Sequence, residues 1–238
     1  MTFQTGIANY GVRDASANLD EAKLAAVATN EQVRMFEINP SRGAKPGKSG
    51  IPPEAKVTGE IARISAIAEG EDPICPNRNP AIDSAEDPLV AIARVRRVAG
   101  KPFDFEAPTD AYGGLNDLCP LIKQLAPAHG PDVVIIDSAD DGTRAAQASL
   151  VDDMGLSLNE SLPLVADVLN RHGLCVHTRI IASGKLTNPG QVAQAMCAAA
   201  DLVVSTRGFM LALGCVHTLQ CYKNTRPSGI ITRHPRLQ

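Results

Sequence analysis

Helical and strand-like segments alternate along the chain from residue 86 onward, and this alternation constrains the fold more than any other feature. Helical patterns cover about residues 86–99, 113–126, 158–172, 189–200 and 208–221. Short apolar runs occur at 103–105, 133–136, 178–182 and 202–205. Pro189, directly after Asn188, marks one helix start well. Strands that alternate with helices predict a parallel sheet with right-handed crossovers.

The first 85 residues are less regular. A helix is expected to start at Leu19 after an N-cap at Asn18, and the apolar run 33–38 reads as a strand. Residues 39–85 are rich in proline, glycine and asparagine, and a loop of this length in a compact domain is usually functional or disordered. Five parallel strands are therefore expected. A closed eight-stranded barrel of about 250 residues has more, so the chain looks like part of one.

Composition limits the partners. The chain has 238 residues, of which 44% are hydrophobic, and this is enough for one substantial core, with a single domain as the simpler reading. Aromatic residues make up only 3%, and the net charge of −3 provides no basic field, so neither nucleic acid nor a membrane surface is an expected partner. Six cysteines are too few for a disulfide scaffold, and no signal peptide or long apolar run is visible. A cytoplasmic location is expected.

Two loops that follow consecutive strands have the residues of an anion site. They are Ser183-Gly184-Lys185 and Thr206-Arg207-Gly208. In barrels, the loops after the last two strands commonly hold a phosphate, because backbone amides and a helix N-terminus converge there. Glycines allow the backbone to approach an anion, and Lys185 or Arg207 can neutralise it. The alternative is a pair of ordinary strand-to-helix turns with surface cations.

Cys215 and Cys221 have a spacing that is typical of metal ligands. Residues six apart on a helix point about 120° away from each other, so joint ligation requires the chain to leave the helix between them. Three or four thiolates are the usual minimum for an iron–sulfur cluster, and the other cysteines are far away in sequence: Cys75, Cys119, Cys175 and Cys197. The alternative is that both cysteines simply pack in an apolar environment.

These segments carry a family resemblance. The carboxyl-terminal part resembles the end of the FMN-binding central domain of glutamate synthase in Ile181-Ala-Ser-Gly-Lys185, Ala200-Asp201, Arg207-Gly-Phe-Met-Leu-Ala-Leu-Gly-Cys215, Cys221-Tyr-Lys-Asn-Thr and Pro227-Ser-Gly. Upstream, Gly43-Ala-Lys-Pro-Gly47 with Gly50, Pro53 and Lys56-Val57 resembles the substrate loop of that family, and Tyr10-Gly-Val-Arg-Asp14 resembles the segment before it. The resemblance spans the chain and is greatest to glutamate-synthase-like single-domain FMN proteins.

The resemblance implies an α/β fold of the (β/α)8 TIM-barrel type, of which residues 1–238 form the C-terminal part as one partial domain. This domain divides into a loop-rich part (1–85), regular βα units (86–206) and a cysteine-containing segment (207–238). It also implies FMN at the C-terminal face, beside a three-iron (3Fe-4S) cluster, and reduction of 2-iminoglutarate, formed from 2-oxoglutarate and ammonia, to glutamate. By matching motifs, Lys45 faces the substrate carboxylates and Cys215 and Cys221 ligate iron. The FMN phosphate is surrounded by Ser183, Gly184, Lys185, Thr206, Arg207 and Gly208.

The chain also departs from the family pattern. Arg226 stands at the third cluster-ligand position and cannot ligate iron, so a complete 3Fe-4S cluster is not expected. Asn39 and Glu106 stand at strand ends where the family has lysines, and a carboxylate there disfavours an anionic reduced flavin. In the loop 137–143, Ser138, Ala139 and Asp141 occupy positions of small family residues. The first strands of the family barrel have no counterpart in this chain.

Three functional hypotheses remain open. The first is a glutamate synthase-type FMN oxidoreductase, with the barrel completed by a partner chain or by a homo-oligomer. The second is a truncated or degenerate pseudoenzyme that acts as a binding or interaction module, or one subunit of a split barrel. The third is a barrel of another chemistry that binds a phosphate-containing ligand through the two anion loops.

Overall fold

The computed structural model describes residues 1–41, 57–70, 76–108, 112–139 and 155–216. Six strands form one sheet: β1 (Thr2–Gln4), β2 (Met35–Ile38), β3 (Phe103–Pro108), β4 (Val133–Asp137), β5 (Arg179–Ser183) and β6 (Leu202–Val204). All neighbouring strands are parallel, and their order in the sheet is their order in the sequence. A parallel sheet in sequential order is typical of a curled part-barrel. The α/β, TIM-barrel-type prediction is therefore confirmed.

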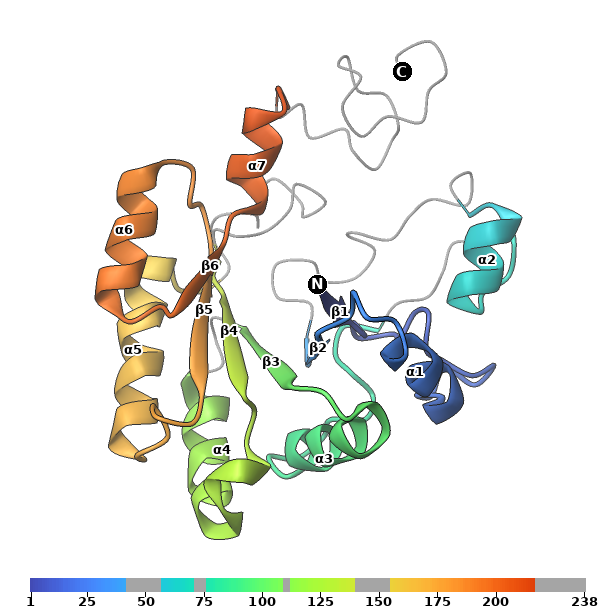
Figure 1. The fold of residues 1–238 in the computed structure, drawn as a ribbon, viewed down its shortest axis with the longest axis horizontal. Helices are drawn as coiled ribbons and strands as arrows, with labels where there is room; N and C mark the ends of the chain where they lie inside the picture. Colours follow the sequence, from blue (N-terminus) through green and yellow to red (C-terminus); the bar gives the residue numbers. More distant parts are fainter. Residues whose placement is uncertain (42–56, 71–75, 109–111, 140–154, 217–238) are drawn as a thin grey trace.

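Helices connect the strands and lie outside the curled sheet (Figure 1). They are α1 (Glu21–Ala28), α2 (Gly59–Ser65), α3 (Asp87–Ala99), α4 (Tyr112–Leu125), α5 (Leu158–Arg171), α6 (Pro189–Ala198) and α7 (Thr206–Ala212), with a 3-10 turn at Pro127–His129. The predicted start of α6 is confirmed, because the Asn188 side chain accepts a hydrogen bond of 3.0 Å from the Gln191 amide. In the described part of the chain, no helix is both long and apolar enough to cross a membrane.

The alternation of side chains along each strand separates two environments. One row faces the helices and forms the main core, in which Phe36, Phe103 and Val134 are completely buried. The opposite row faces the interior of the curl and is mixed in character. Its members Val133, Ile135 and Ile181 form a second small cluster against which Met35 packs, while Glu37, Asp104 and Glu106 are acidic members of the same row. The interior row is therefore the row that builds the site.

Four sequence expectations were wrong in detail. A sixth strand, β1, was missed because a three-residue strand with Phe3 as its only apolar member gives almost no pattern. The first helix is capped by Asp20 and not by Asn18, because the Asp20 carboxylate accepts from the Ala22 and Lys23 amides. The segment 39–85 is not all loop, because it contains α2. The last helix covers 206–212 and not 208–221, because Gly214, with φ +88°, turns the chain away.

The sheet formed by the described residues is open. β1 pairs with β2 alone and β6 with β5 alone, so each presents one unpaired edge. The interior-row side chains of β6, Leu202 and Val204, are 57% and 40% exposed, whereas Ile181 of neighbouring β5 is 6% exposed. A closed barrel packs its interior row into a core. The interior is therefore open on the β6 side.

Candidate functional site

Parallel strands bring their carboxyl ends to the same edge of the sheet, and the polar residues of the site lie there. Asn39 follows β2, Glu106 lies in β3, and Asp137 and Ser183 end β4 and β5. Ser183 and Asp137 are register partners, and Ser138 donates its amide to the Ser183 carbonyl at 3.1 Å. This edge is where a barrel holds its ligands.

The loops after β5 and β6 adjoin each other. The Ser205 hydroxyl donates a hydrogen bond to the Leu186 carbonyl, which ties the end of β6 to the loop after β5. A Cβ atom on Gly208 would lie 2.7 Å from that same carbonyl oxygen, and a Cβ atom on Gly184 would lie 2.9 Å from the Ser138 hydroxyl. Gly208 is therefore required by the close approach of the segments after β5 and β6, and Gly184 by the approach of Ser138 and Leu158.

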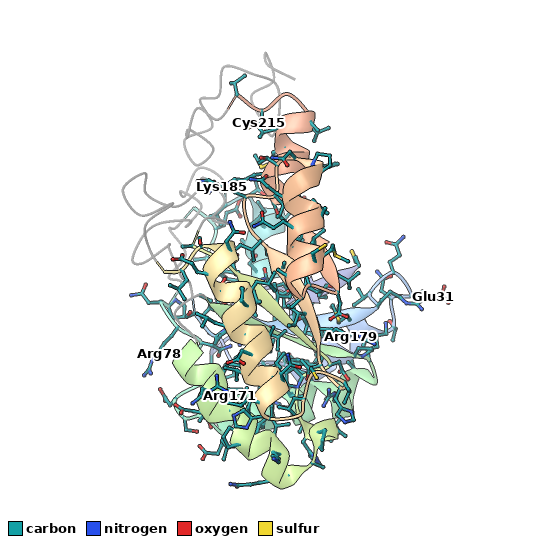
Figure 2. All side chains as sticks on the ribbon, turned by 90° about the vertical axis from the view of Figure 1, so that its left-hand side faces the viewer. Glu31, Arg78, Arg171, Arg179, Lys185 and Cys215 are labelled. Carbon is teal, nitrogen blue, oxygen red and sulfur yellow. The ribbon has the colours of Figure 1, made fainter. Side chains whose placement is uncertain are left out.

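The predicted phosphate residues gather at this junction. Ser183 and Arg207 are buried, at 5% and 2% exposure, and Lys185 is half-buried. Thr206, Arg207 and Gly208 form the first turn of α7 and not a loop before it. Figure 2 shows Lys185 and Cys215 near the same end of the molecule, with Arg171 toward the other end. That these residues bind a phosphate stays a prediction.

The cysteines do not form a metal site in the described part of the chain. Cys215 is buried just beyond α7, so the chain has left the helix before it, as joint ligation with Cys221 requires. Burial raises the pKa of Cys119 to about 11, so this thiol stays protonated, and Cys175 and Cys197 are exposed. Among the described residues, no group of three or more His, Cys, Asp or Glu side chains can hold a metal ion.

Several of the predicted positions lie outside the described residues. These are Lys45, Cys75, Asp141, Cys221 and Arg226. The roles that the resemblance gives to Lys45 and Cys221 therefore stay predictions, as does the loss of an iron ligand at Arg226.

The structure brings together a group of acidic residues on the interior row, which we call the carboxylate cluster: Glu37, Asp104, Glu106 and Asp137. The Glu106 carboxylate accepts hydrogen bonds from Asn39 Nδ2 at 2.9 Å and Gln4 Nε2 at 2.8 Å. Gln4 Nε2 also donates to Glu37 Oε1. The two positions where the family has lysines are thus in direct contact, as an amide and a carboxylate.

The alternation of apolar and acidic residues along β2 and β3 predicts this cluster from the sequence. In Phe103-Asp104-Phe105-Glu106 the aromatic and acidic residues alternate, and the same is true of Phe36-Glu37-Ile38. With a period of two, the acids must face away from the helices and toward the interior of the curl. Of these three acids, Glu106 was predicted from the sequence as a site residue, whereas Glu37 and Asp104 were missed.

Burial changes the protonation of the cluster. Burial and the neighbouring Glu37 carboxylate raise the pKa of Asp104 to about 8, although the nearby Phe105 amide offsets part of this rise. Burial, the charge of Asp137 and the contacts with Glu37 hold the pKa of Glu106 well above its usual range. Asp104 is completely buried, and neither of its carboxylate oxygens has a hydrogen-bond partner. Unpartnered buried carboxyls are rare in folded proteins.

Six ion pairs of the described residues involve acids outside the cluster. These acids are Asp83, Glu21, Asp132, Asp167 and Asp201. Arg179, on the interior row, is 2.9 Å from Asp201 and lies at the opposite end of β5 from Ser183. The cluster therefore brings four carboxyl groups together, and the raised pKa values of Asp104 and Glu106 favour their neutral, protonated forms.

Comparisons with known proteins agree with this architecture. A family model described as a conserved region in glutamate synthase matches residues 2–238. The glutamate synthase large subunit-like protein YerD of Bacillus subtilis is 32% identical over 235 residues, which are 99% of this chain and 44% of that protein. The archaeal glutamate synthase [NADPH] of Methanocaldococcus jannaschii is 32% identical over 202 residues, which are 85% of this chain and 39% of that protein.

Among solved structures, a putative lyase/mutase from Burkholderia cenocepacia is similar at a TM-score of 0.40 with 11% identity, over 85% of this chain and 58% of that one. The chain spans less than half the length of the two curated relatives named above. The match to the family model covers nearly every residue, including both adjoining loops and the cysteine segment. The chain therefore belongs to the glutamate synthase family.

Proposed function

We propose that this chain forms part of a glutamate synthase-type oxidoreductase that reduces 2-iminoglutarate, formed from 2-oxoglutarate and ammonia, to glutamate with FMN. The observation that carries the proposal is the junction of the loops after β5 and β6, where Ser183 and Arg207 are buried beside Lys185. Buried hydroxyl and guanidinium groups at the carboxyl ends of the last strands fit the phosphate of FMN. The family membership supports the reaction class.

The two ends of the site fit the cofactor differently. The end of the site formed by the segments after β5 and β6 has the cations and the close backbone approach that a phosphate needs. When bound, FMN would supply the hydride for reduction of the imine. The strand end presents an amide and a carboxyl group, Asn39 and Glu106, and an ionised carboxylate there would disfavour an anionic reduced flavin and a dicarboxylate substrate. We assign to Lys45 the binding of the substrate carboxylates. We also place the protein in the cytoplasm, in keeping with its few cysteines.

Titration of the purified chain with FMN tests the cofactor. The wild-type chain is expected to quench FMN fluorescence, and Lys185→Glu to weaken the affinity at least tenfold, because it places a negative charge beside the phosphate; this factor is about 1.4 kcal/mol. Lys123→Glu, on the exposed face of α4, makes the same change in net charge and should leave the affinity unaltered. If the wild-type chain does not bind FMN, either alone or with a partner chain, the proposal fails.

A second candidate function is a non-catalytic binding module, and it is favoured by the carboxylate cluster together with Arg226. The variant Arg226→Cys restores the family's third ligand and should raise the iron content after anaerobic reconstitution, if the pocket around Cys215 and Cys221 is otherwise intact. Iron and sulfide analysis measures this, with Arg226→Ser as the matched control. Equal iron in both variants would show that the cluster pocket is lost, and would favour the binding module.

A further inference from the structure

We propose that the cavity between α5 and α6 binds a small aliphatic carboxylate, with its apolar chain against the two helices and its carboxylate group at Lys185. Both helices lie on the outer side of the sheet (Figure 1), so this site is separate from the reaction that we propose at the strand ends. Figure 2 faces the two helices and shows Lys185 toward one end of the molecule, with Arg171, the last residue of α5, toward the other. The ligand site is therefore at the amino-terminal end of α5.

Three segments of the described chain line the cavity, which has a volume of about 260 Å³. From α6 come residues 191, 194, 195 and 198, which share one face of the helix because they are three or four positions apart. The first turns of α5 contribute residues 158, 159, 162 and 163, and the segment after β5 contributes residues 185 and 186. Packed helices and the segment that joins β5 to α6 therefore shape the cavity.

The apolar part of the lining determines the body of the ligand. Leu158 and Leu162 of α5 and Ala195 of α6 line the cavity and are themselves buried. Aliphatic carbons of a ligand leave water when they pack against these side chains, which favours binding. The volume is just below the range of about 300–1,000 Å³ that is typical for drug-sized ligands, so a ligand with a chain of about five or six carbon atoms fits.

The Gln191 side chain presents hydrogen-bond donors at the cavity. Its Oε1 atom accepts hydrogen bonds from the Thr187 amide at 2.8 Å and from the Thr187 hydroxyl at 3.1 Å. Because a backbone amide can only donate, this contact fixes the oxygen on the Thr187 side and leaves Nε2 as the other end. In the described part of the chain, no group accepts a hydrogen bond from that Nε2 atom. A ligand that accepts hydrogen bonds is therefore favoured.

Charge determines which accepting group fits best. Lys185 is half-buried, and among the described residues that line the cavity it is the one with a charge. Its ammonium group has three N–H donors, so it can bind a carboxylate in addition to a contact within the protein. Glu160, in the first turn of α5, is held by the Ser157 amide at 2.9 Å and the Ser157 hydroxyl at 2.7 Å. A carboxylate between Lys185 and Gln191 therefore meets donors on both sides.

An NMR titration of the chain with 4-methylpentanoate tests the site. We expect saturable shifts of the Gln191 and Gln194 side-chain amide signals and of the Ala195 backbone amide signal at millimolar probe concentrations. Acetate has the charge without the chain, and 4-methylpentanamide has the chain without the charge. Each should bind roughly tenfold more weakly than 4-methylpentanoate. FMN is absent from all samples, so the result is independent of the proposed function.

Two variants test the charge of the site. Lys185→Gln should raise the Kd of 4-methylpentanoate roughly tenfold, because it removes the cation, whereas Lys185→Arg should retain most of the affinity. Gln194→Glu adds a negative charge to the wall formed by α6 and should raise the Kd roughly threefold. Gln194 is exposed, so this variant tests the proposal even if Lys185→Gln folds poorly. Gln124→Glu, at an exposed position of α4, makes the same change in charge and should leave the Kd unaltered.

The outcomes that would overturn the proposal are definite. They are the absence of saturable shifts with 4-methylpentanoate, equal affinity for acetate or for the amide, and an unchanged Kd in folded Lys185→Gln or in Gln194→Glu. Flavin titration is a separate measurement. Loss of FMN binding with intact binding of 4-methylpentanoate would refute only the proposed function, and the reverse result would refute only the carboxylate site.

Discussion

Asp104→Asn is expected to make the isolated chain more stable to heat at pH 9 than the wild type. The Asp104 carboxyl is buried without a hydrogen-bond partner, and its pKa is raised from 3.8 to about 8. At pH 9 the folded wild type must hold an unpaired charge in a dry interior, whereas asparagine stays neutral.

The direction of the pH dependence follows from proton binding. Between pH 3.8 and about 8 the unfolded chain has lost the Asp104 proton while the folded chain still binds it. The stabilising contribution is therefore complete below the lower value, falls as the pH rises, and is lost above the upper one. Each pH unit in this window costs up to about 1.4 kcal/mol, so the advantage of the variant over the wild type grows up to about pH 8.

Thermal or urea unfolding at several values from pH 5 to pH 9 measures this effect. The wild-type curve should fall steeply with pH and the Asp104→Asn curve less steeply. Some slope should remain, because Glu106 also has a raised pKa. Asp167→Asn, an exposed acid in an ion pair with Arg171, is the matched control and should follow the wild type. Parallel curves for Asp104→Asn and wild type would contradict the buried, unpaired state of this carboxyl.

Gly208→Ala is expected to damage both the fold and the anion site. The added methyl group would lie 2.7 Å from the Leu186 carbonyl oxygen, which is backbone and cannot rotate away. The two loops must then separate, which costs about 1–3 kcal/mol of unfolding free energy. Because Ser183 and Lys185 adjoin the segment after β5 and Arg207 lies in the first turn of α7, FMN affinity should fall at least tenfold. Urea unfolding and fluorescence titration measure the two effects.

The control for Gly208→Ala is Gly114→Ala in α4. A Cβ atom there would meet no atom within 4 Å, so the same substitution in an open helical position should stabilise the chain by roughly 0.5–1 kcal/mol. FMN affinity should be unaltered. If Gly208→Ala behaved like Gly114→Ala, the close contact between the loops after β5 and β6 would be wrong.

The regular part of the fold was predictable because its signals are local. An apolar run such as 133–136 predicts a strand, and a capping residue such as Asn188 predicts a helix start, from only a few neighbouring positions. Both β4 and α6 occur where they were expected. β1 was not predictable, because Thr2–Gln4 becomes a strand only through pairing with β2. The end of α7 was also missed, because the apolar pattern continues through Leu213 while Gly214 leaves the helix.

The candidate site was likewise predictable only in part. The loops at Ser183 and Thr206 were recognisable as motifs, and the sheet order brings them together. The carboxylate cluster was not recognised, because it joins Glu37, Asp104 and Asp137 from three strands, and sequence spacing alone does not show which strands are neighbours. The unpaired state of Asp104 is a property of burial, which becomes visible only when the whole interior row is assembled. Single-domain organisation over 1–238 stays a prediction.

The sequential order of the strands has a consequence for how such a barrel can be divided between genes. Each strand from β1 to β6 pairs only with the units before and after it in the sequence. A cut between two βα units therefore breaks two strand pairings of a closed ring and leaves every other contact on one piece or the other. Both pieces keep layered cores of their own, with local contacts that favour rapid folding. A fold assembled in this way can be divided at the boundary between two βα units without separating any other neighbouring strands.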